Sequence, residues 1–354
     1  MKEGKTPTLP VDIMLAPEWW HHHEGITFDE DYFYNPKRRV EVERQMEKAL
    51  YERWGRYRQG SDHDKDLPQV GAVHLAAGFM LSEMMGCKVQ YNEGSPPQVI
   101  PADFDKLQLD VDAPFQSPVY QRFRKMTDAL KSQYGYLLGD VNWSGVVNMA
   151  LDLRGQQFFM DMFDQPEQAR SFLGAIAQVL SRFINGMEQE TGSTSISVNR
   201  IVRFFEEPIC LHSACSYTMI SEADYENFVM PFDRKWSEEH AAYGIHYCGA
   251  DPHRHAGMFA RLPKLSFLDV GWGGDVKQLR KLLPETFLSI RLSPVELIEQ
   301  SVEEIRETIT RLVDESDNPQ LTGVCCINMD EKVTDDKITA IFETVEELER
   351  MILD

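Results

Sequence analysis

Gly244-Ile245-His246-Tyr247-Cys248-Gly249 opens the series of short apolar runs that decides the fold of this chain. Each run has the length of a strand, and a segment with helical periodicity separates it from the next. Strands that alternate with helices indicate βα units around a parallel sheet. The predicted strands of this half of the chain lie at residues 245–248, 265–270, 286–291 and 321–327.

The rest of the chain follows the same alternation. Extended residues on both sides of Glu93-Gly94-Ser95 indicate a hairpin-like insertion over residues 88–99. The count of about eight strand–helix units predicts a (β/α)8 TIM barrel with an N-terminal extension and this insertion. No linker divides the chain, so we expect residues 1–354 to form a single domain. Further strands are predicted at residues 11–16, 136–141 and 209–212, and helices at 36–58, 117–134, 156–162, 166–191, 222–243, 301–315 and 334–353.

Composition and charge restrict the classes of partner. Of the 354 residues, 42% are hydrophobic and 26% are charged, which is ordinary for a protein with a packed core. A formal net charge of −21 argues against binding to nucleic acid and to anionic membrane surfaces, because both need a basic face. The N-terminus lacks the apolar core of a signal peptide, no apolar run reaches the length of a membrane span, and the 6 cysteines are too sparse for a disulfide framework. We therefore expect a cytoplasmic protein with free or metal-bound thiols.

A pair of metal-ligand side chains stands at the end of the predicted strand 245–248. His246 and Cys248 are two residues apart, so in a strand their side chains point to the same face. Cys325 and Cys326 lie near the end of the last predicted strand, and only one of two adjacent residues can face the same metal. An imidazole and two thiolates with a fourth position open are the ligand set of a catalytic zinc. The alternative is a set of buried structural thiols, which are common in cores.

Two other groups near these strands are weaker metal-ligand candidates. The segment Cys210-Leu211-His212-Ser213-Ala214-Cys215 could bind metal or line a pocket, but a core strand with polar ends is the favoured interpretation. Glu206 or Glu207 could supply an exchangeable fourth carboxylate ligand, although a solvated pair in a loop is favoured.

Aromatic and polar residues after the predicted strands are candidates for binding a small substrate. Trp19-Trp20-His21-His22-His23 follows the first strand, and its alternative role is a surface loop with an aromatic anchor. Asp269 could line the mouth of a barrel, as could Asp140, which could equally cap a helix. The substrate-binding candidates are Trp19, His21, His22, Tyr34, Asn142, Trp143, His212 and Asp269.

Several common site motifs are absent from the sequence. No glycine pattern GxGxxG follows a predicted strand, and no phosphate loop GxxxxGK[ST] occurs. The nucleophile motif GxSxG is also absent. Dinucleotide binding, P-loop phosphate binding and α/β-hydrolase chemistry are therefore not indicated.

Four segments together resemble the uroporphyrinogen decarboxylase superfamily. The first joins Leu153–Asp161 to Asp164-Gln165-Pro166-Glu167, and the others are Met219–Pro231, Ser293-Pro294 and the HxCG pattern at His246–Gly249. The last pattern is similar to the zinc signature of the corrinoid-dependent methyltransferase branch of that superfamily. The resemblance extends from about residue 70 to the C-terminus, and it implies a (β/α)8 barrel.

The resemblance also implies an activity, a cofactor and a partner. The methyltransferase branch uses zinc to move a methyl group between a small molecule and the cobalt of a corrinoid (cobalamin) that a separate protein carries. It implies His246, Cys248 and Cys326 as zinc ligands with catalytic roles, with Cys325 as the alternative to Cys326. The decarboxylase branch needs no metal and has an arginine-rich motif near its first strand, where this chain has Trp19–His23. The aromatic first segment favours O-demethylation of a methylated substrate such as a methoxylated aromatic, and methylation of a thiol is the alternative.

Overall fold

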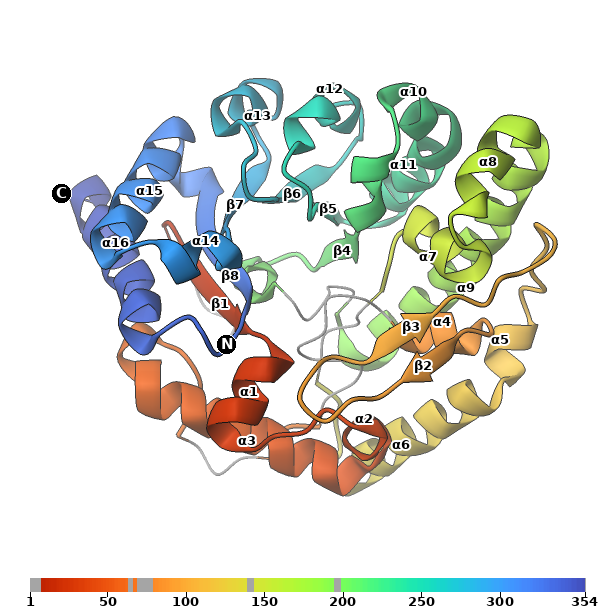
Figure 1. The fold of residues 1–354 in the computed structure, drawn as a ribbon, viewed down its shortest axis with the longest axis horizontal. Helices are drawn as coiled ribbons and strands as arrows, with labels where there is room; N and C mark the ends of the chain where they lie inside the picture. The colour runs from red at the N-terminus through yellow and green to blue at the C-terminus, as the bar shows by residue number, and fades with distance from the viewer. Residues whose placement is uncertain (1–7, 63–65, 69–78, 139–142, 194–198, 354) are drawn as a thin grey trace.

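Six parallel strands form a single curved sheet in the computed structural model, which describes residues 8–62, 66–68, 79–138, 143–193 and 199–353. Figure 1 shows the sheet curling around the middle of the molecule with helices on its outside. The sheet order is β1-β8-β7-β6-β5-β4. This arrangement is that of a (β/α)8 TIM-like barrel, which confirms the predicted fold class. The strands are β1 (Val11–Leu15), β4 (Ile209–Ser213), β5 (Ala242–His246), β6 (Leu265–Val270), β7 (Phe287–Leu292) and β8 (Thr322–Met329).

The first and last strands along the chain, β1 and β8, are neighbours in the sheet, as barrel closure requires. β1 pairs with β8 in parallel, with Asp12 opposite Cys325 and Ile13 opposite Cys326. Beyond β4 the pairing continues as an isolated parallel bridge between Ser144 and Ser213. The strand predicted at residues 136–141 lies partly outside the described residues.

Most predicted helices lie close to their expected bounds because strong local signals begin them. Asn35, Ser117 and Ser301 cap three of these helices by accepting hydrogen bonds from backbone N–H groups of the first turn. The long helices are α3 (Pro36–Trp54), α6 (Pro118–Tyr134), α9 (Pro166–Thr191), α11 (Met230–Glu239), α15 (Val302–Glu315) and α16 (Asp335–Leu353). The shorter helices are α1 (Pro17–Glu24), α2 (Glu30–Tyr34), α4 (Phe79–Met84), α5 (Ala113–Gln116), α7 (Val146–Arg154), α8 (Gln157–Asp164), α10 (Glu222–Asp224), α12 (Ala256–Phe259), α13 (Val276–Leu282) and α14 (Pro294–Glu299), with single turns η1 (Gly55–Tyr57), η2 (Arg200–Phe204), η3 (Cys215–Met219), η4 (Tyr225–Val229), η5 (Pro252–Arg254) and η6 (Pro319–Leu321).

One predicted helix is shorter than expected, and this changes the strand that follows it. The helix predicted over residues 222–243 ends at Glu239, and β5 occupies Ala242–His246 instead of 245–248. Gly244 sits in the middle of this strand, where a Cβ atom would come within 2.8 Å of Ile209 on β4. The glycine is therefore a close-approach position inside the barrel, and the strand ends at His246.

The predicted hairpin insertion is present. β2 (Lys88–Gln90) and β3 (Gln98–Ile100) pair in antiparallel fashion. In Figure 1 this hairpin lies across the side of the ring opposite β5, β6 and β7.

Apolar side chains cover the outer faces of β1 and β8, and polar side chains gather on the inner faces of β6 and β7 toward their C-terminal ends. The outward residues of β1 and β8, such as Ile13 and Val324, pack with Ile338 and Ile341 of α16 in one buried cluster. The inward faces of β6 and β7 carry polar side chains, including Asp269 and Ser289, which are both fully buried. No helix among the described residues is long and apolar enough to cross a membrane.

Candidate metal centre

Cys215, His246 and Cys248 meet at the C-terminal ends of two neighbouring strands. Their ligand atoms all lie within 4.8 Å of one another. Cys248 Sγ is 2.9 Å from His246 Nε2, and the sulfur atoms of Cys215 and Cys248 are joined as a disulfide. His246 is buried, whereas both cysteines are half-buried, so the cluster can be reached from the barrel mouth. We call these three residues the Cys-His-Cys cluster.

The pairing of β4 with β5 brings the two cysteines together. Ser213 is opposite His246, and each is the last residue of its strand. Cys215 and Cys248 follow these two residues at the same offset, so parallel pairing places them side by side. Ser213 Oγ is also 3.2 Å from Cys215 Sγ.

Asp269 on β6 orients the imidazole of His246. Its Oδ2 atom makes a short contact with His246 Nδ1, which leaves Nε2 directed at Cys248. Burial by itself would raise the pKa of Asp269, but the charge and hydrogen bond of His246 hold this pKa below its ordinary value. A carboxylate behind a metal-binding histidine is the usual way that its tautomer is set.

The donor set fits a zinc ion. Zinc prefers thiolate sulfur and imidazole nitrogen, and three protein ligands leave a fourth position for substrate. The supporting contact from Asp269 to the ring of His246 is the outer partner that such sites need. Binding would require Cys215 and Cys248 in the reduced state, because thiolate is the metal-binding form.

The expected third ligand, Cys326, lies elsewhere, and this prediction needs correction. Cys326 is fully buried on the outward face of β8, in the cluster that includes Ile338 of α16. Its Sγ atom contacts the carbonyl oxygen of Leu292 at 3.7 Å, and burial raises the pKa of its thiol to about 12. The register of β8 turns this side chain toward the helices and away from the barrel interior.

The alternative, Cys325, faces the interior but does not join the Cys-His-Cys cluster. Its Sγ atom is 3.6 Å from Asp269 Oδ1 and 3.3 Å from Ser289 Oγ. Burial raises the pKa of this thiol well above its ordinary value. Cys325 is therefore a buried neighbour of the carboxylate that orients His246.

Glu206 and Glu207 cannot supply the fourth ligand in this arrangement. Both side chains are exposed and precede Ile209, the first residue of β4. Cys215 follows the opposite end of that strand, so the carboxylates lie at the wrong end of the barrel.

The aromatic and histidine segment after β1 forms helix α1. Trp19 is fully buried and packs against Trp54 and Arg53 of α3, so it belongs to the core. His21 and His22 are exposed on the same helix, and their role in substrate binding stays a prediction.

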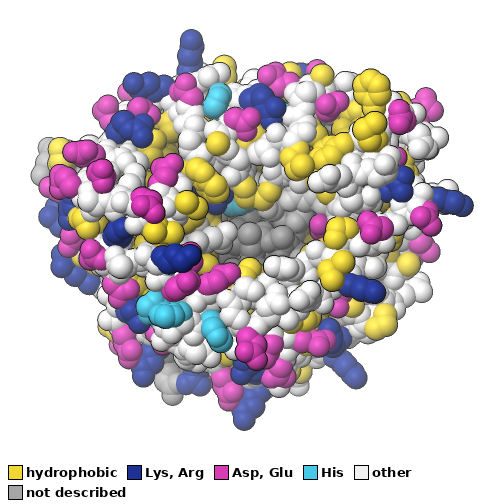
Figure 2. Space-filling model, viewed as in Figure 1, with side chains coloured by type: hydrophobic (Ala, Val, Ile, Leu, Met, Phe, Trp, Pro, Cys, Tyr) yellow, Lys and Arg dark blue, Asp and Glu magenta, His cyan; other side chains and the backbone are white. Residues whose placement is uncertain are grey.

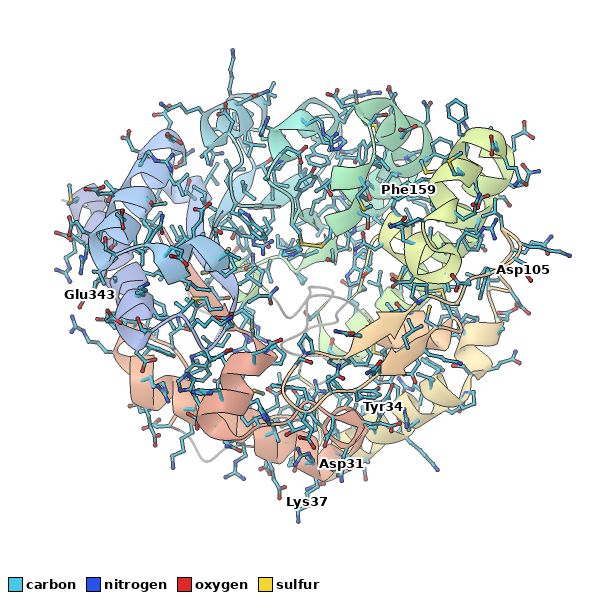
Figure 3. All side chains as sticks on the ribbon, viewed as in Figure 1. Asp31, Tyr34, Lys37, Asp105, Phe159 and Glu343 are labelled. Carbon is cyan, nitrogen blue, oxygen red and sulfur yellow. A yellow bond between two sulfur atoms is a disulfide. The ribbon has the colours of Figure 1, made fainter. Side chains whose placement is uncertain are left out.

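Tyr34 lies apart from the Cys-His-Cys cluster. Its hydroxyl group donates to Glu83, and the guanidinium of Arg122 stacks on its ring at 3.7 Å. Tyr34 is the last residue of α2, and Figure 3 places it near α6, across the ring from β5.

Trp143 and His212 are buried behind the cluster. Their rings stack with centroids 4.9 Å apart, and His212 Nε2 is 2.6 Å from the hydroxyl of Tyr243. Burial, followed by the charge of His246, lowers the pKa of His212 to about 3, so this ring is neutral at pH 7. Neither side chain is exposed to a substrate. Asn142 and Asp140 lie outside the described residues.

Comparison with solved structures finds the same fold in a methyltransferase and in a methionine synthase. A methyltransferase from Methanosarcina mazei is 15% identical, with a TM-score of 0.64 over 98% of this chain and 95% of that one. A B12-independent methionine synthase from Shewanella sp. W3-18-1, solved with selenomethionine, is 11% identical, with a TM-score of 0.52 over 99% of each chain. No curated protein sequence matches this chain.

A protein-family model matches most of the sequence. The profile described as uroporphyrinogen decarboxylase (URO-D) matches residues 72–348. That span contains β4 to β8 and every residue of the Cys-His-Cys cluster. The chain belongs to the uroporphyrinogen decarboxylase family.

Proposed function

We propose that this protein is a zinc-dependent methyltransferase. It moves a methyl group between a small methylated molecule, such as a methoxylated aromatic, and the cobalt of a corrinoid that a partner protein carries. The observation that carries the proposal is the Cys-His-Cys cluster at the C-terminal ends of β4 and β5, where barrel enzymes place their reacting groups. The fold shared with a methyltransferase and with a methionine synthase supports the same reaction class.

The residues of the cluster have separate tasks in this proposal. Cys215, His246 and Cys248 hold the zinc ion, and Asp269 keeps the Nε2 atom of His246 available as a ligand. When bound, zinc supplies Lewis acidity to the oxygen or sulfur of the substrate. Methylation of a thiol uses the same three ligands, and it remains the alternative direction of transfer.

Metal analysis tests the proposal directly. Protein purified under reducing conditions should contain about one zinc ion per chain, because the three ligands surround one position. Cys215→Ala, His246→Ala and Cys248→Ala should each lose most of that zinc. Cys326→Ala is the matched control, since it removes a buried thiol that faces the helices, and it should keep the zinc.

A second measurement identifies the reaction. Zinc-loaded protein should demethylate one of a panel of methoxylated aromatics when Co(I) cobalamin is the acceptor, with formation of methyl-cobalamin followed by absorbance. Failure with every donor, together with methylation of a thiol from methyl-cobalamin, would reverse the direction. Zinc-free wild-type protein that decarboxylates a porphyrinogen would replace the proposal with the activity for which the family is described.

A further inference from the structure

Arg291 is a buried cation on the inner face of the barrel. It lies near the C-terminal end of β7 and is 3% exposed. Side chains two residues apart share a face of a strand, and Ser289 faces inward, where its hydroxyl contacts Cys325 and Asn199. The next residue, Leu292, packs in the outer apolar cluster. The guanidinium of Arg291 therefore points into the interior.

Two nitrogen atoms of the Arg291 guanidinium lack an acceptor among the described residues. Its Nε and Nη1 atoms are buried and have no hydrogen-bond partner in the described part of the chain. Arg280 offers a contrast, because that buried arginine donates to the carbonyl oxygens of Ser316, Leu283, Thr286 and Leu321. Burial of polar groups without partners is costly, so Nε and Nη1 need an acceptor that the described residues do not supply.

The nearest carboxylate is already occupied. The positive charge of Arg291 helps to lower the pKa of Asp269. The carboxylate oxygens of Asp269 nevertheless contact other residues, because Oδ2 contacts His246 and Oδ1 contacts Cys325. The other neighbour is aromatic, because the ring of Trp272 lies 5.1 Å from the guanidinium carbon. A guanidinium group beside an aromatic ring suits a ligand that has both a carboxylate and a planar ring.

The strand register relates Arg291 to the Cys-His-Cys cluster. His246 is opposite Asp269, and Asp269 is opposite Ser289. Arg291 is two residues beyond Ser289, as Cys248 is two residues beyond His246, so both stand at one level of the barrel. Two strand spacings, roughly 10 Å, separate β5 from β7. Figure 1 shows β5, β6 and β7 side by side on one side of the ring of strands.

We propose that Arg291 binds the carboxylate of a monoanionic aromatic acid whose methylated oxygen is held at the Cys-His-Cys cluster. This inference rests on the proposed function and names its substrate class. Arg291 offers one positive charge, which in a chain of net charge −21, with acidic side chains spread over the face seen in Figure 2, suits one acid group better than many. The carboxylate would accept a charge-assisted hydrogen bond from the guanidinium at one of the two atoms that lack a partner, Nε or Nη1.

Binding measurements on the reduced, zinc-loaded protein test this assignment. The probes are 2-, 3- and 4-methoxybenzoate, each compared by calorimetry with the corresponding neutral methoxybenzamide. Wild-type protein should bind at least one acid about 10- to 100-fold more tightly than its amide, as expected for hydrogen bonds to a charged group. Arg291→Gln should abolish this preference, and Arg291→Lys should keep part of it. Arg261→Gln is the control, because that arginine pairs with Glu226 on the surface.

The outcomes separate this inference from the proposed function. Equal affinity for acid and amide in the wild-type protein, or no binding of any acid, overturns the role of Arg291, as does a preference that survives in Arg291→Gln. If Arg291→Gln does not fold, the role of Arg291 is still tested by the affinities of wild-type protein for acid and amide and by the reduced preference expected in Arg291→Lys. Zinc content is measured on the same samples and should not change in the Arg291 variants. Protein that lacks zinc but prefers the acids would refute the proposed metal and leave the acid site standing.

Discussion

At the scale of single residues, the candidate metal centre depends on how one imidazole is held. His246 is the last residue of β5, and its ring lies between the carboxylate of Asp269 and the sulfur of Cys248. Because Nδ1 is held by the carboxylate, Nε2 is the nitrogen left for a metal. Asp269 is thus a positioning residue, although the sequence indicated only a residue that lines the barrel mouth.

Asp269→Asn should weaken zinc binding about 10- to 100-fold, because an amide orients and polarises the imidazole less well than a carboxylate. The measurement is competition with a chelator in reduced protein. Asp233→Asn is the matched control, since Asp233 is equally buried but does not contact His246, and its zinc affinity should equal that of wild type. Unchanged affinity in Asp269→Asn would refute the positioning role.

At the scale of elements, the turns after β5 and β6 hold the cluster in place. A Cβ atom on Gly271, which follows β6, would lie 1.8 Å from the carbonyl oxygen of Gly249. Gly249 directly follows Cys248, so the two turns touch at the edge of the Cys-His-Cys cluster. The contact is between backbone atoms, which cannot move aside as a flexible side chain can.

Gly271→Ala should therefore displace the turn that carries Cys248. We expect a loss of roughly 1–3 kcal/mol in the free energy of unfolding, the usual range for overpacking, together with reduced zinc content. Gly257→Ala is the control, because a Cβ atom on Gly257 in α12 meets nothing within 4 Å. Thermal unfolding and metal analysis of both variants check this. A Gly271→Ala protein with wild-type zinc content and stability would contradict the close contact.

At the scale of the whole molecule, a buried carboxyl group joins a helix of the outer layer to the sheet. Asp233 on α11 accepts hydrogen bonds from Tyr217 of η3 and Tyr225 of η4. Burial raises the pKa of Asp233 to about 7, and the hydrogen bonds of Tyr225, Tyr243 and Tyr217 oppose this only in part. Its ordinary pKa of 3.8 applies to the unfolded chain. Between pH 3.8 and about pH 7, Asp233 is protonated in the folded protein and ionised in the unfolded chain. Asp233 therefore stabilises the fold at low pH, and this stabilisation is lost as the pH rises through about 7.

Asp233→Asn should remove this pH dependence. The variant should gain stability relative to wild type by roughly 3 kcal/mol between about pH 5 and about pH 8, since one pKa unit corresponds to about 1.4 kcal/mol. Urea unfolding of both proteins at the two pH values measures the difference. His212 also makes stability depend on pH, because its pKa is about 3 in the folded state and 6.5 in the unfolded chain, but both proteins contain it, so the difference between them reports on Asp233. A stability difference that is independent of pH would show that Asp233 does not titrate in this range.

The sequence alone determined most of the secondary structure, because its signals are local. Apolar runs predicted β6 at residues 265–270, and the segment between two predicted strands was expected to contain a helix at 301–315, close to the observed α15. The same alternation predicted a (β/α)8 barrel, and the HxCG pattern predicted His246 and Cys248 as one pair of ligand groups. These signals depend on residues a few positions apart, so they can be read without knowledge of the fold.

Only the tertiary structure decided the third member of the cluster. Alternation along β8 shows that Cys325 and Cys326 face opposite ways, but pairing with β1 and β7 determines which of them faces inward. The register of β4 against β5 likewise places Cys215 beside Cys248, at equal offsets from Ser213 and His246. The isolation of Arg291 also appears only in three dimensions, because the lack of an acceptor depends on every side chain around it. Contacts between strands distant in sequence are set by packing of the whole barrel, and a local pattern does not record them.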